Sequence, residues 1–188
     1  MKIILLFIFF IVGANANLNQ SLEENKKSCK NGEAIECFNV GLMYLVGQGT
    51  KKNIFESLGY LEKSCNGNYA KGCSILAGIY FDGDIVEKNI LKTIELYEKA
   101  CDLNEKSSCY NLGIIYIKDG GTLKNANKAK VAFEKACKLK HGEGCFSLAI
   151  IYAQKKRTKK NFNKMKNYLI KSCDLGNKRG CKSYNNLK

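Results

Sequence analysis

The sequence of 188 residues contains no proline and a single histidine, His141. The absence of proline is consistent with uninterrupted helices, because proline removes a backbone hydrogen-bond donor and clashes with the preceding turn. One histidine is too few for a metallo-enzyme centre, and no two cysteines lie the two to four residues apart that zinc sites favour. No apolar run beyond residue 16 is long enough to span a bilayer. We therefore expect neither a metal ion nor another cofactor.

Negative charge is also scarce, because 17 Asp and Glu residues stand against 31 Lys and Arg residues and the formal net charge is +14. Such a basic surface attracts anionic partners non-specifically. The densest run supplies the candidate anion-binding residues, which are Lys155, Lys156, Arg157, Lys159 and Lys160. The affinity of this run for a polyanion would fall steeply with salt. The alternative is a solvated basic loop without a ligand.

Cysteine, in contrast, is abundant and regularly placed. The ten cysteines form five Cys-x7-Cys pairs that recur every 36 residues without an insertion or deletion. A fixed period of this size is typical of a solenoid, in which each unit buries its apolar face against its neighbours. Other residue types keep the same period, among them Tyr44, Tyr80, Tyr116 and Tyr152.

Residues 89–119 show how one unit is expected to fold. Asn89 is placed to cap a helix that runs to Cys101, and after a turn a second helix runs through Cys109 and Tyr116 with apolar residues at helical spacing. We therefore predict an all-α fold, an α/α superhelical solenoid of 36-residue helix-turn-helix repeats. About ten helices are expected, in a right-handed superhelix, from a helix near residues 19–30 through four helix pairs to a short helix near residues 178–187.

The spacing within each cysteine pair predicts local disulfides. Eight residues along one continuous helix would separate the two Cα atoms by about 12 Å, whereas a disulfide tolerates about 7 Å, so a turn must fold the second helix back. Closing each nine-residue loop contributes about 2.5 kcal/mol in a chain-entropy estimate. The predicted bridges, one per repeat, are Cys29–Cys37, Cys65–Cys73, Cys101–Cys109, Cys137–Cys145 and Cys173–Cys181.

Two further repeat positions are interpreted as packing positions. One holds only the smallest residues, namely Gly41, Ala77, Gly113 and Ala149, which indicates that a neighbouring helix crosses there at close range. The tyrosine position is interpreted as inter-helix packing rather than as a cofactor site. His141 occupies a position that holds glutamate, tyrosine or asparagine in the sister units, and this mixture indicates an exposed turn.

The first 16 residues have the features of a targeting peptide. Lys2 gives a charged start, an apolar core follows, and Ala14-Asn15-Ala16 is an A-x-A-like cleavage site. We predict that the mature chain is a single domain over residues 17–188, made of a half repeat (17–32), four repeats (33–176) and a C-terminal helix (177–188). Export to the periplasm or the extracellular space also fits the regular cysteines.

Two segments carry a family resemblance. Residues 93–116 read TIELYEKACDLNEKSSCYNLGIIY and residues 129–152 read AKVAFEKACKLKHGEGCFSLAIIY. With their E-K-A-C element and their variants of a G-C-x-x-L-G pattern, S-C-Y-N-L-G in the first segment and G-C-F-S-L-A in the second, they resemble the Helicobacter cysteine-rich proteins, which are secreted Sel1-like repeat proteins of the tetratricopeptide-related class. The resemblance covers the whole mature chain and implies one disulfide per repeat, secretion and a protein-interaction role. It also implies penicillin binding with slow β-lactamase activity.

We therefore predict a secreted or periplasmic scaffold that binds a protein or peptide on its concave face. The amides of Asn39 and Asn111 can each donate to and accept from an extended peptide backbone, and the alternative is that they are solvated side chains at a helix edge. We expect a monomer that contacts no specific nucleic acid and, once the targeting peptide is removed, no membrane. The candidate peptide-binding residues, which share one repeat position, are Asn39, Ile75, Asn111 and Ser147.

Two other functions stay open at the level of the sequence. β-Lactam hydrolysis is implied only by the resemblance, because the Ser-x-x-Lys, Ser-Asp-Asn and Lys-Thr-Gly elements of the serine enzymes are absent. We assign no catalytic residue. The second alternative is the binding of anionic surface polymers through the basic run, and export argues against nucleic acid as the polymer.

Overall fold

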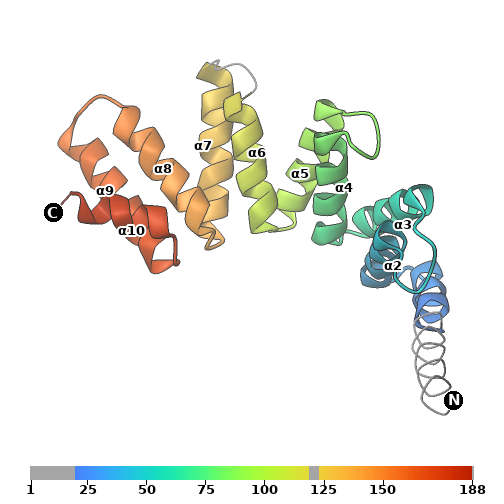
Figure 1. Ribbon diagram of the computed structural model, residues 1–188. Coiled ribbons are helices and arrows are strands. Elements are labelled where there is room, and N and C mark those ends of the chain that lie inside the picture. The colour runs from blue at the N-terminus through green and yellow to red at the C-terminus, as the bar shows by residue number, and fades with distance from the viewer. Residues whose placement is uncertain (1–19, 119–122, 188) are drawn as a thin grey trace, which may run out of the picture. The chain divides into compact units, whose positions relative to one another are not determined.

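The computed structural model describes residues 20–118 and 123–187, in which all regular structure is helical (Figure 1). Within these ranges ten helices occur, which confirms the predicted all-α fold of helix-turn-helix repeats. None of these helices combines the length and the apolar character that a bilayer crossing requires. The predicted targeting peptide lies outside the described residues. After a helix over residues 20–30, the helices are α2 (Ala34–Val46), α3 (Ile54–Asn66), α4 (Ala70–Asp82), α5 (Ile90–Asp102), α6 (Lys106–Lys118), α7 (Leu123–Lys138), α8 (Gly142–Gln154), α9 (Lys159–Asp174) and α10 (Lys178–Asn185).

Five disulfides join the end of one helix to the start of the next, with the predicted pairing. Each bridge spans eight residues, and the paired Cα atoms lie between 4.5 and 4.7 Å apart. The cysteines of the first four bridges are buried, whereas Cys173 and Cys181 are half-buried. One disulfide per repeat is thus a property of the fold.

The turn inside each disulfide loop needs one residue with a left-handed backbone. Glycine adopts positive φ at no steric cost and asparagine tolerates it, so these residues suit the position. The residues that carry it lie 36 positions apart, and they are Gly32 (φ 94°), Asn68 (62°), Asn104 (67°), Lys140 (64°) and Gly176 (82°). The repeat therefore preserves the backbone conformation of the turn even where the side chain changes.

The described contacts divide the chain into two compact units, the first of which ends at Thr93. Its α2 and α3 pack closely because Gly41 has no side chain, and a Cβ atom there would lie 2.9 Å from Cγ of Leu61. This confirms the close helix crossing predicted from the small residues. A core cluster of this unit consists of Leu22, Val40 and Met43, with Tyr44 and Tyr60 packed against it.

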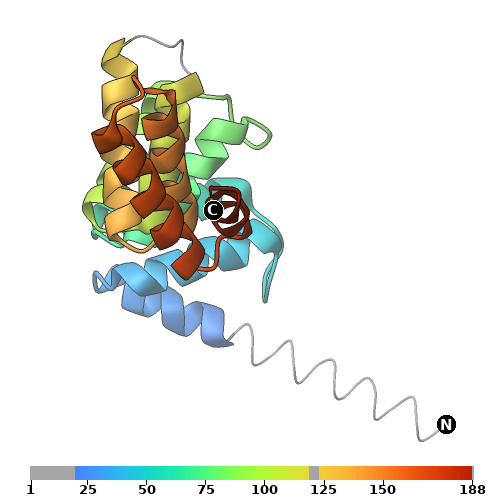
Figure 2. The same ribbon diagram turned by 90° about the vertical axis from the view of Figure 1, so that its left-hand side faces the viewer.

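The second unit begins at Ile94 and contains two helix pairs that lie side by side, α6 with α7 and α8 with α9 (Figure 1; Figure 2). At Gly113, α6 approaches the ring of Phe133 in α7 so closely that a Cβ atom would lie 2.5 Å from its Cε1 atom. A core cluster of this unit consists of Cys101, Cys109 and Ala136, with Tyr110 and Leu139 against it.

Several helices begin after a residue whose polar side chain caps their first turn. The side chains of Asn53 and Asn89 accept hydrogen bonds from the backbone amide three residues on, at 3.2 and 2.9 Å, so the predicted cap at Asn89 is confirmed. In the fourth repeat Thr158 caps α9, and Asn161 instead donates its amide to the carbonyl of Lys156 at 2.8 Å. The loop before α9 is therefore tied to the helix that follows it.

His141 caps α8, and its environment differs from the exposed turn that the sequence indicated. The imidazole is half-buried, stacks on Tyr110 with ring centroids 4.8 Å apart, and accepts a hydrogen bond from the amide of Gly144 on Nδ1 at 3.2 Å. Burial, and then the charge of Lys106, lower the pKa of His141 from its usual 6.5. The neutral ring is therefore the form that the fold stabilises.

The His141 cap makes part of the stability depend on pH. Because the pKa is lower in the folded than in the unfolded protein, this contribution is fully present above about pH 6.5 and is lost as the pH falls from there through the lower pKa of the folded protein. His141→Asn keeps a cap without titrating, since Asn177 at the equivalent position accepts from the amide of Gly180 at 2.9 Å. From about pH 7.5 to about pH 5, we expect the wild type to lose up to about 1 kcal/mol relative to His141→Asn in urea unfolding. Parallel pH profiles would contradict this.

Candidate functional site

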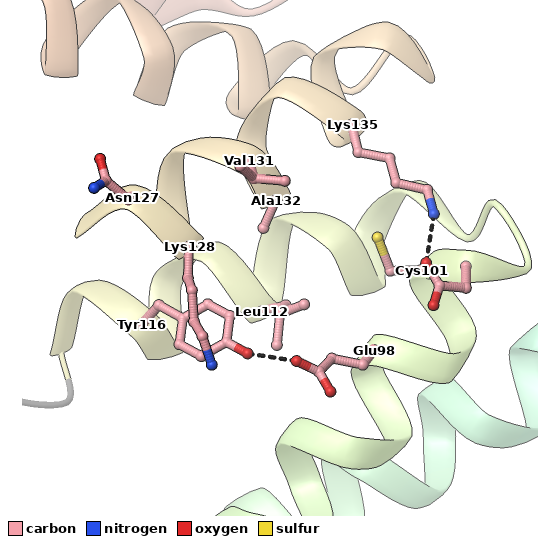
Figure 3. Close-up of a pocket in the computed structure, with 10 residues that line it drawn as sticks. Glu98, Cys101, Leu112, Tyr116, Asn127, Lys128, Val131, Ala132 and Lys135 are labelled. Carbon is pink, nitrogen blue, oxygen red and sulfur yellow. Dashed lines mark hydrogen bonds and ion pairs between the residues drawn. The ribbon is translucent and has the colours of Figure 1, made fainter. Parts of the chain in front are cut away.

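The tyrosine of α6 lies in a charged environment that recurs along the chain. Tyr116 is buried, its hydroxyl donates to Oε1 of Glu98 in α5 at 2.6 Å, and Nζ of Lys128 in α7 lies 5.1 Å from the ring centroid (Figure 3). Burial, followed by the bond to Glu98, raises the pKa of Tyr116. The phenol is therefore a permanent hydrogen-bond donor to the carboxylate and a poor nucleophile at neutral pH.

The same positions are occupied by the same residue types in the neighbouring repeats. Lys92 donates to the hydroxyl of Tyr80 at 2.8 Å and pairs with Glu62 at 3.3 Å. Lys164 donates to the hydroxyl of Tyr152 at 3.4 Å. We call this arrangement the Glu–Tyr–Lys set, and each of its three positions recurs every 36 residues. The carboxylates are Glu62, Glu98 and Glu134, and the ammonium groups are Lys92, Lys128 and Lys164.

The first repeat carries the reverse order of charge. Lys26 stands where the other repeats have glutamate, and its Nζ lies 5.4 Å from the ring centroid of Tyr44. Glu56 stands where they have lysine, and both residues line one cleft of about 380 Å³ with Tyr44 and Tyr60. The two rings stack with centroids 5.8 Å apart. Tyr44, Tyr80 and Tyr116 therefore each lie near both signs of charge, in either order, whereas Glu134 of the last set pairs with Lys130 at 2.8 Å.

A groove opens beside Tyr116 over α5, α6 and α7 (Figure 3). Its floor is apolar, because Leu112 and Ala132 are buried, whereas Val131 at its mouth is 63% exposed. The volume of about 440 Å³ is in the range of known ligand pockets. The residues that line it are Glu98, Cys101, Asp102, Leu112, Tyr116, Asn127, Lys128, Val131, Ala132 and Lys135.

The rims of this α5–α7 groove carry charges of both signs. Lys135 reaches across from α7 to pair with Asp102 of α5 at 2.7 Å, and Glu98 and Lys128 flank Tyr116 at the other end (Figure 3). The lining includes neither serine nor histidine, and its one cysteine is held in a disulfide. The groove can therefore hold an apolar side chain between polar contacts, and it offers no paired nucleophile and base.

The predicted peptide-binding residues lie outside this groove. Asn39 and Asn111 are half-buried, and their amides donate within the protein, to Glu36 at 3.0 Å and to the hydroxyl of Tyr97 at 3.3 Å. Ile75 is 36% exposed and Ser147 is half-buried. Their role in peptide binding stays a prediction.

The predicted anion-binding residues lie at the turn between α8 and α9. All five side chains are exposed, and four of them line a cleft of about 550 Å³. These four are Lys155, Lys156, Arg157 and Lys159. Among the described residues, no group of three or more His, Cys, Asp or Glu side chains is arranged to hold a metal ion.

The charged members of the Glu–Tyr–Lys set were not predicted from the sequence. The tyrosines were recognised from the period of 36 residues, and the glutamates and lysines keep that same period. A comparison of charge at each repeat position would have found them. The groove itself has no such signal, since three helices contribute to it.

Comparison with known proteins gives consistent matches. The family model of the Sel1 repeat matches residues 37–69, 70–105, 106–141 and 142–177. Helicobacter pylori cysteine rich protein B is 31% identical, with a TM-score of 0.54 over 70% of this chain and 94% of that chain. No curated protein sequence matches the chain.

Two other solved structures share the fold at lower identity. The first is c5321, described as a protective antigen present in uropathogenic Escherichia coli strains, with a TM-score of 0.74 at 22% identity over 88% of this chain and 36% of that chain. The second is a Sel1 repeat protein from Oxalobacter formigenes, with a TM-score of 0.71 at 22% identity over 88% of this chain and 66% of that chain. The chain thus spans less than two thirds of the length of either protein.

Proposed function

The chain belongs to the Sel1 repeat family, and on this basis we propose that it is an exported, disulfide-stabilised scaffold that binds a protein or peptide partner. Repeat proteins of this kind present extended surfaces to other proteins. The observation that carries the proposal is the α5–α7 groove, where a buried apolar floor lies between rims of both charges. An extended peptide fits such a surface, because it offers alternate side chains to the floor and polar groups to the rims.

Export is supported by the chemistry of the cysteines. Every cysteine is in a disulfide, and such bonds persist in oxidising compartments rather than in the cytosol. We propose that residues 1–16 direct export and that residues 17–188 are the mature scaffold, in the periplasm or outside the cell. Asn39, Ile75, Asn111 and Ser147 are proposed as further residues that contact a peptide.

Selection of a displayed peptide library on the oxidised protein tests this function. We expect the enriched peptides to contain an apolar residue flanked by charges and to bind in the α5–α7 groove. Val131→Glu places a charge at the groove mouth and should weaken a selected peptide at least about tenfold in isothermal titration, because a buried apolar contact is lost. Val46→Glu is the matched control, since Val46 is 66% exposed at the end of α2 and should leave binding unchanged.

Each result of the selection has a defined meaning. If binding is lost in Asn39→Ala or Asn111→Ala but kept in Val131→Glu, the peptide binds at the substituted asparagine and the groove is contradicted. A library that enriches no peptide, or peptides that bind all these variants equally, would contradict the scaffold proposal itself.

A further inference from the structure

The turn between α8 and α9 forms a cleft whose composition differs from that of the α5–α7 groove. We call it the basic cleft, and its lining contains no carboxylate. Residues 144–173 as a whole contain eight Lys or Arg residues and no Asp or Glu. The residues that line the cleft are Tyr152, Ala153, Lys155, Lys156, Arg157, Thr158, Lys159, Asn161, Phe162 and Met165.

The positive charges of the basic cleft are not neutralised within the described part of the protein. Lys155, Lys156, Arg157 and Lys159 are exposed, and none of them forms an ion pair with a described residue. The α5–α7 groove, in contrast, joins Lys135 to a carboxylate across its rim. Four cations gathered without counter-charge around one cleft repel each other, and an anionic ligand would relieve that repulsion.

The floor of the basic cleft is aromatic and aliphatic. Tyr152 stacks on Tyr168 with ring centroids 5.7 Å apart, and the ammonium of Lys155 lies 5.3 Å from the Tyr152 ring centroid. Phe162, near the start of α9, is 49% exposed, and Met165 is half-buried one turn further on. Apolar surface that lies open beside cations would be covered by an apolar group of a ligand.

The loop that carries the cations is held in place before any ligand binds. Thr158 accepts a hydrogen bond from the amide of Asn161 at 3.2 Å, and the side chain of Asn161 donates to the carbonyl of Lys156 at 2.8 Å. A loop that is already ordered loses less conformational entropy when it binds. The basic cleft therefore has a fixed backbone with cations on its rim and aromatic rings in its floor.

We propose that the basic cleft binds an acidic peptide segment that carries an aromatic or aliphatic side chain among its carboxylates. The inference rests on the proposed function as a peptide-binding scaffold and names the chemistry of one partner segment. A bare polyanion would satisfy the four cations but would leave Phe162 open to solvent. The combination of apolar floor and cationic rim thus favours the acidic peptide over a phosphate or sulfate polymer.

Binding of a fluorescent peptide of repeated Glu-Glu-Phe triplets to the oxidised protein tests the inference. The double substitution Lys156→Glu/Arg157→Glu should weaken the binding of this peptide at least about tenfold, because attraction to its carboxylates is lost and repulsion is added. Phe162→Ala should weaken it about fivefold and leave unchanged the binding of a Glu-Glu-Ser peptide of equal charge. The matched control is Lys51→Glu/Lys52→Glu, the same change of charge in the exposed loop between α2 and α3, which should change the affinity by less than about twofold.

Three outcomes would overturn the inference. Absence of Glu-Glu-Phe binding would do so directly. If polyphosphate or the Glu-Glu-Ser peptide binds as tightly as the Glu-Glu-Phe peptide, and Phe162→Ala has no effect, the basic cleft is a site for polyanions. Equal loss in Lys51→Glu/Lys52→Glu would show a response to net charge alone. If the Glu-Glu-Phe peptide does not bind but library peptides still bind the α5–α7 groove, only this inference is removed and the scaffold function stands.

Discussion

Removal of the Cys137–Cys145 disulfide by a double substitution with alanine is expected to lower the free energy of unfolding by about 2.5 kcal/mol. The bridge closes a short loop in the unfolded chain, and both cysteines are buried between α7 and α8 in the folded one. Each repeat contacts mainly its neighbours, so one interior hairpin that opens also weakens the stacking on either side. Guanidinium unfolding without reductant, followed by circular dichroism, measures the change.

The last disulfide of the chain provides the comparison for this experiment. Cys173 and Cys181 close a loop of the same length but are half-buried and belong to the terminal hairpin of α9 and α10. Substitution of half-buried cysteines removes fewer packing contacts than substitution of buried ones, so we expect a smaller loss for Cys173→Ala/Cys181→Ala. An interior variant that unfolds within about 0.5 kcal/mol of the wild type would show that the disulfides do not stabilise the fold as described.

Gly113→Ala is expected to destabilise the protein by about 2 kcal/mol, although alanine is the better helix former. The new Cβ atom would lie 2.5 Å from the ring of Phe133, which is fully buried and has no room to move. Gly59→Ala is the matched control, because Gly59 lies in α3 with no atom within 4 Å of the position of a Cβ. That substitution should raise the free energy of unfolding by about 0.5–1 kcal/mol.

The fourth repeat shows how the clash at Gly113 can be relieved. The equivalent positions there hold Ala149 and Leu169, both of which are buried. Gly113→Ala combined with Phe133→Leu should therefore recover most of the lost stability, with a coupling of at least about 1 kcal/mol in a double-mutant cycle. Additive effects of the two substitutions would mean that the contact between α6 and α7 is not what excludes a side chain at residue 113.

The features of the fold that were predicted from the sequence are those determined by covalent geometry and by the 36-residue period. The hairpins followed from the spacing of the cysteines, because no continuous helix brings two residues eight apart within reach of a disulfide. The close crossings followed from the small residues, and the structure has them at Gly41 and Gly113. These features depend on positions within one repeat or in its immediate neighbour, so they can be predicted when the repeats of the sequence are compared with one another.

The parts that were missed depend on how individual side chains lie in three dimensions. The amide of Asn111 donates to Tyr97, which lies 14 residues earlier on another helix, and no repeat pattern indicates this contact, whereas its role in peptide binding stays a prediction. His141 was assigned to an exposed turn, because its position shows mixed residue types, yet the ring stacks on Tyr110 and caps α8. Neither the α5–α7 groove nor the basic cleft has a sequence motif, since each requires atoms from several elements at once.

The reversed order of charge around Tyr44 restricts how this chain can gain or lose repeats in evolution. A deletion of residues 70–105 would leave Glu62 before Tyr116 and Lys128 after it, so Tyr116 would keep one charge of each sign. A deletion of the same length over residues 34–69 would instead place Tyr80 between Lys26 and Lys92, with two ammonium groups against one ring. The chain can therefore be shortened by a repeat in its interior more readily than at its beginning.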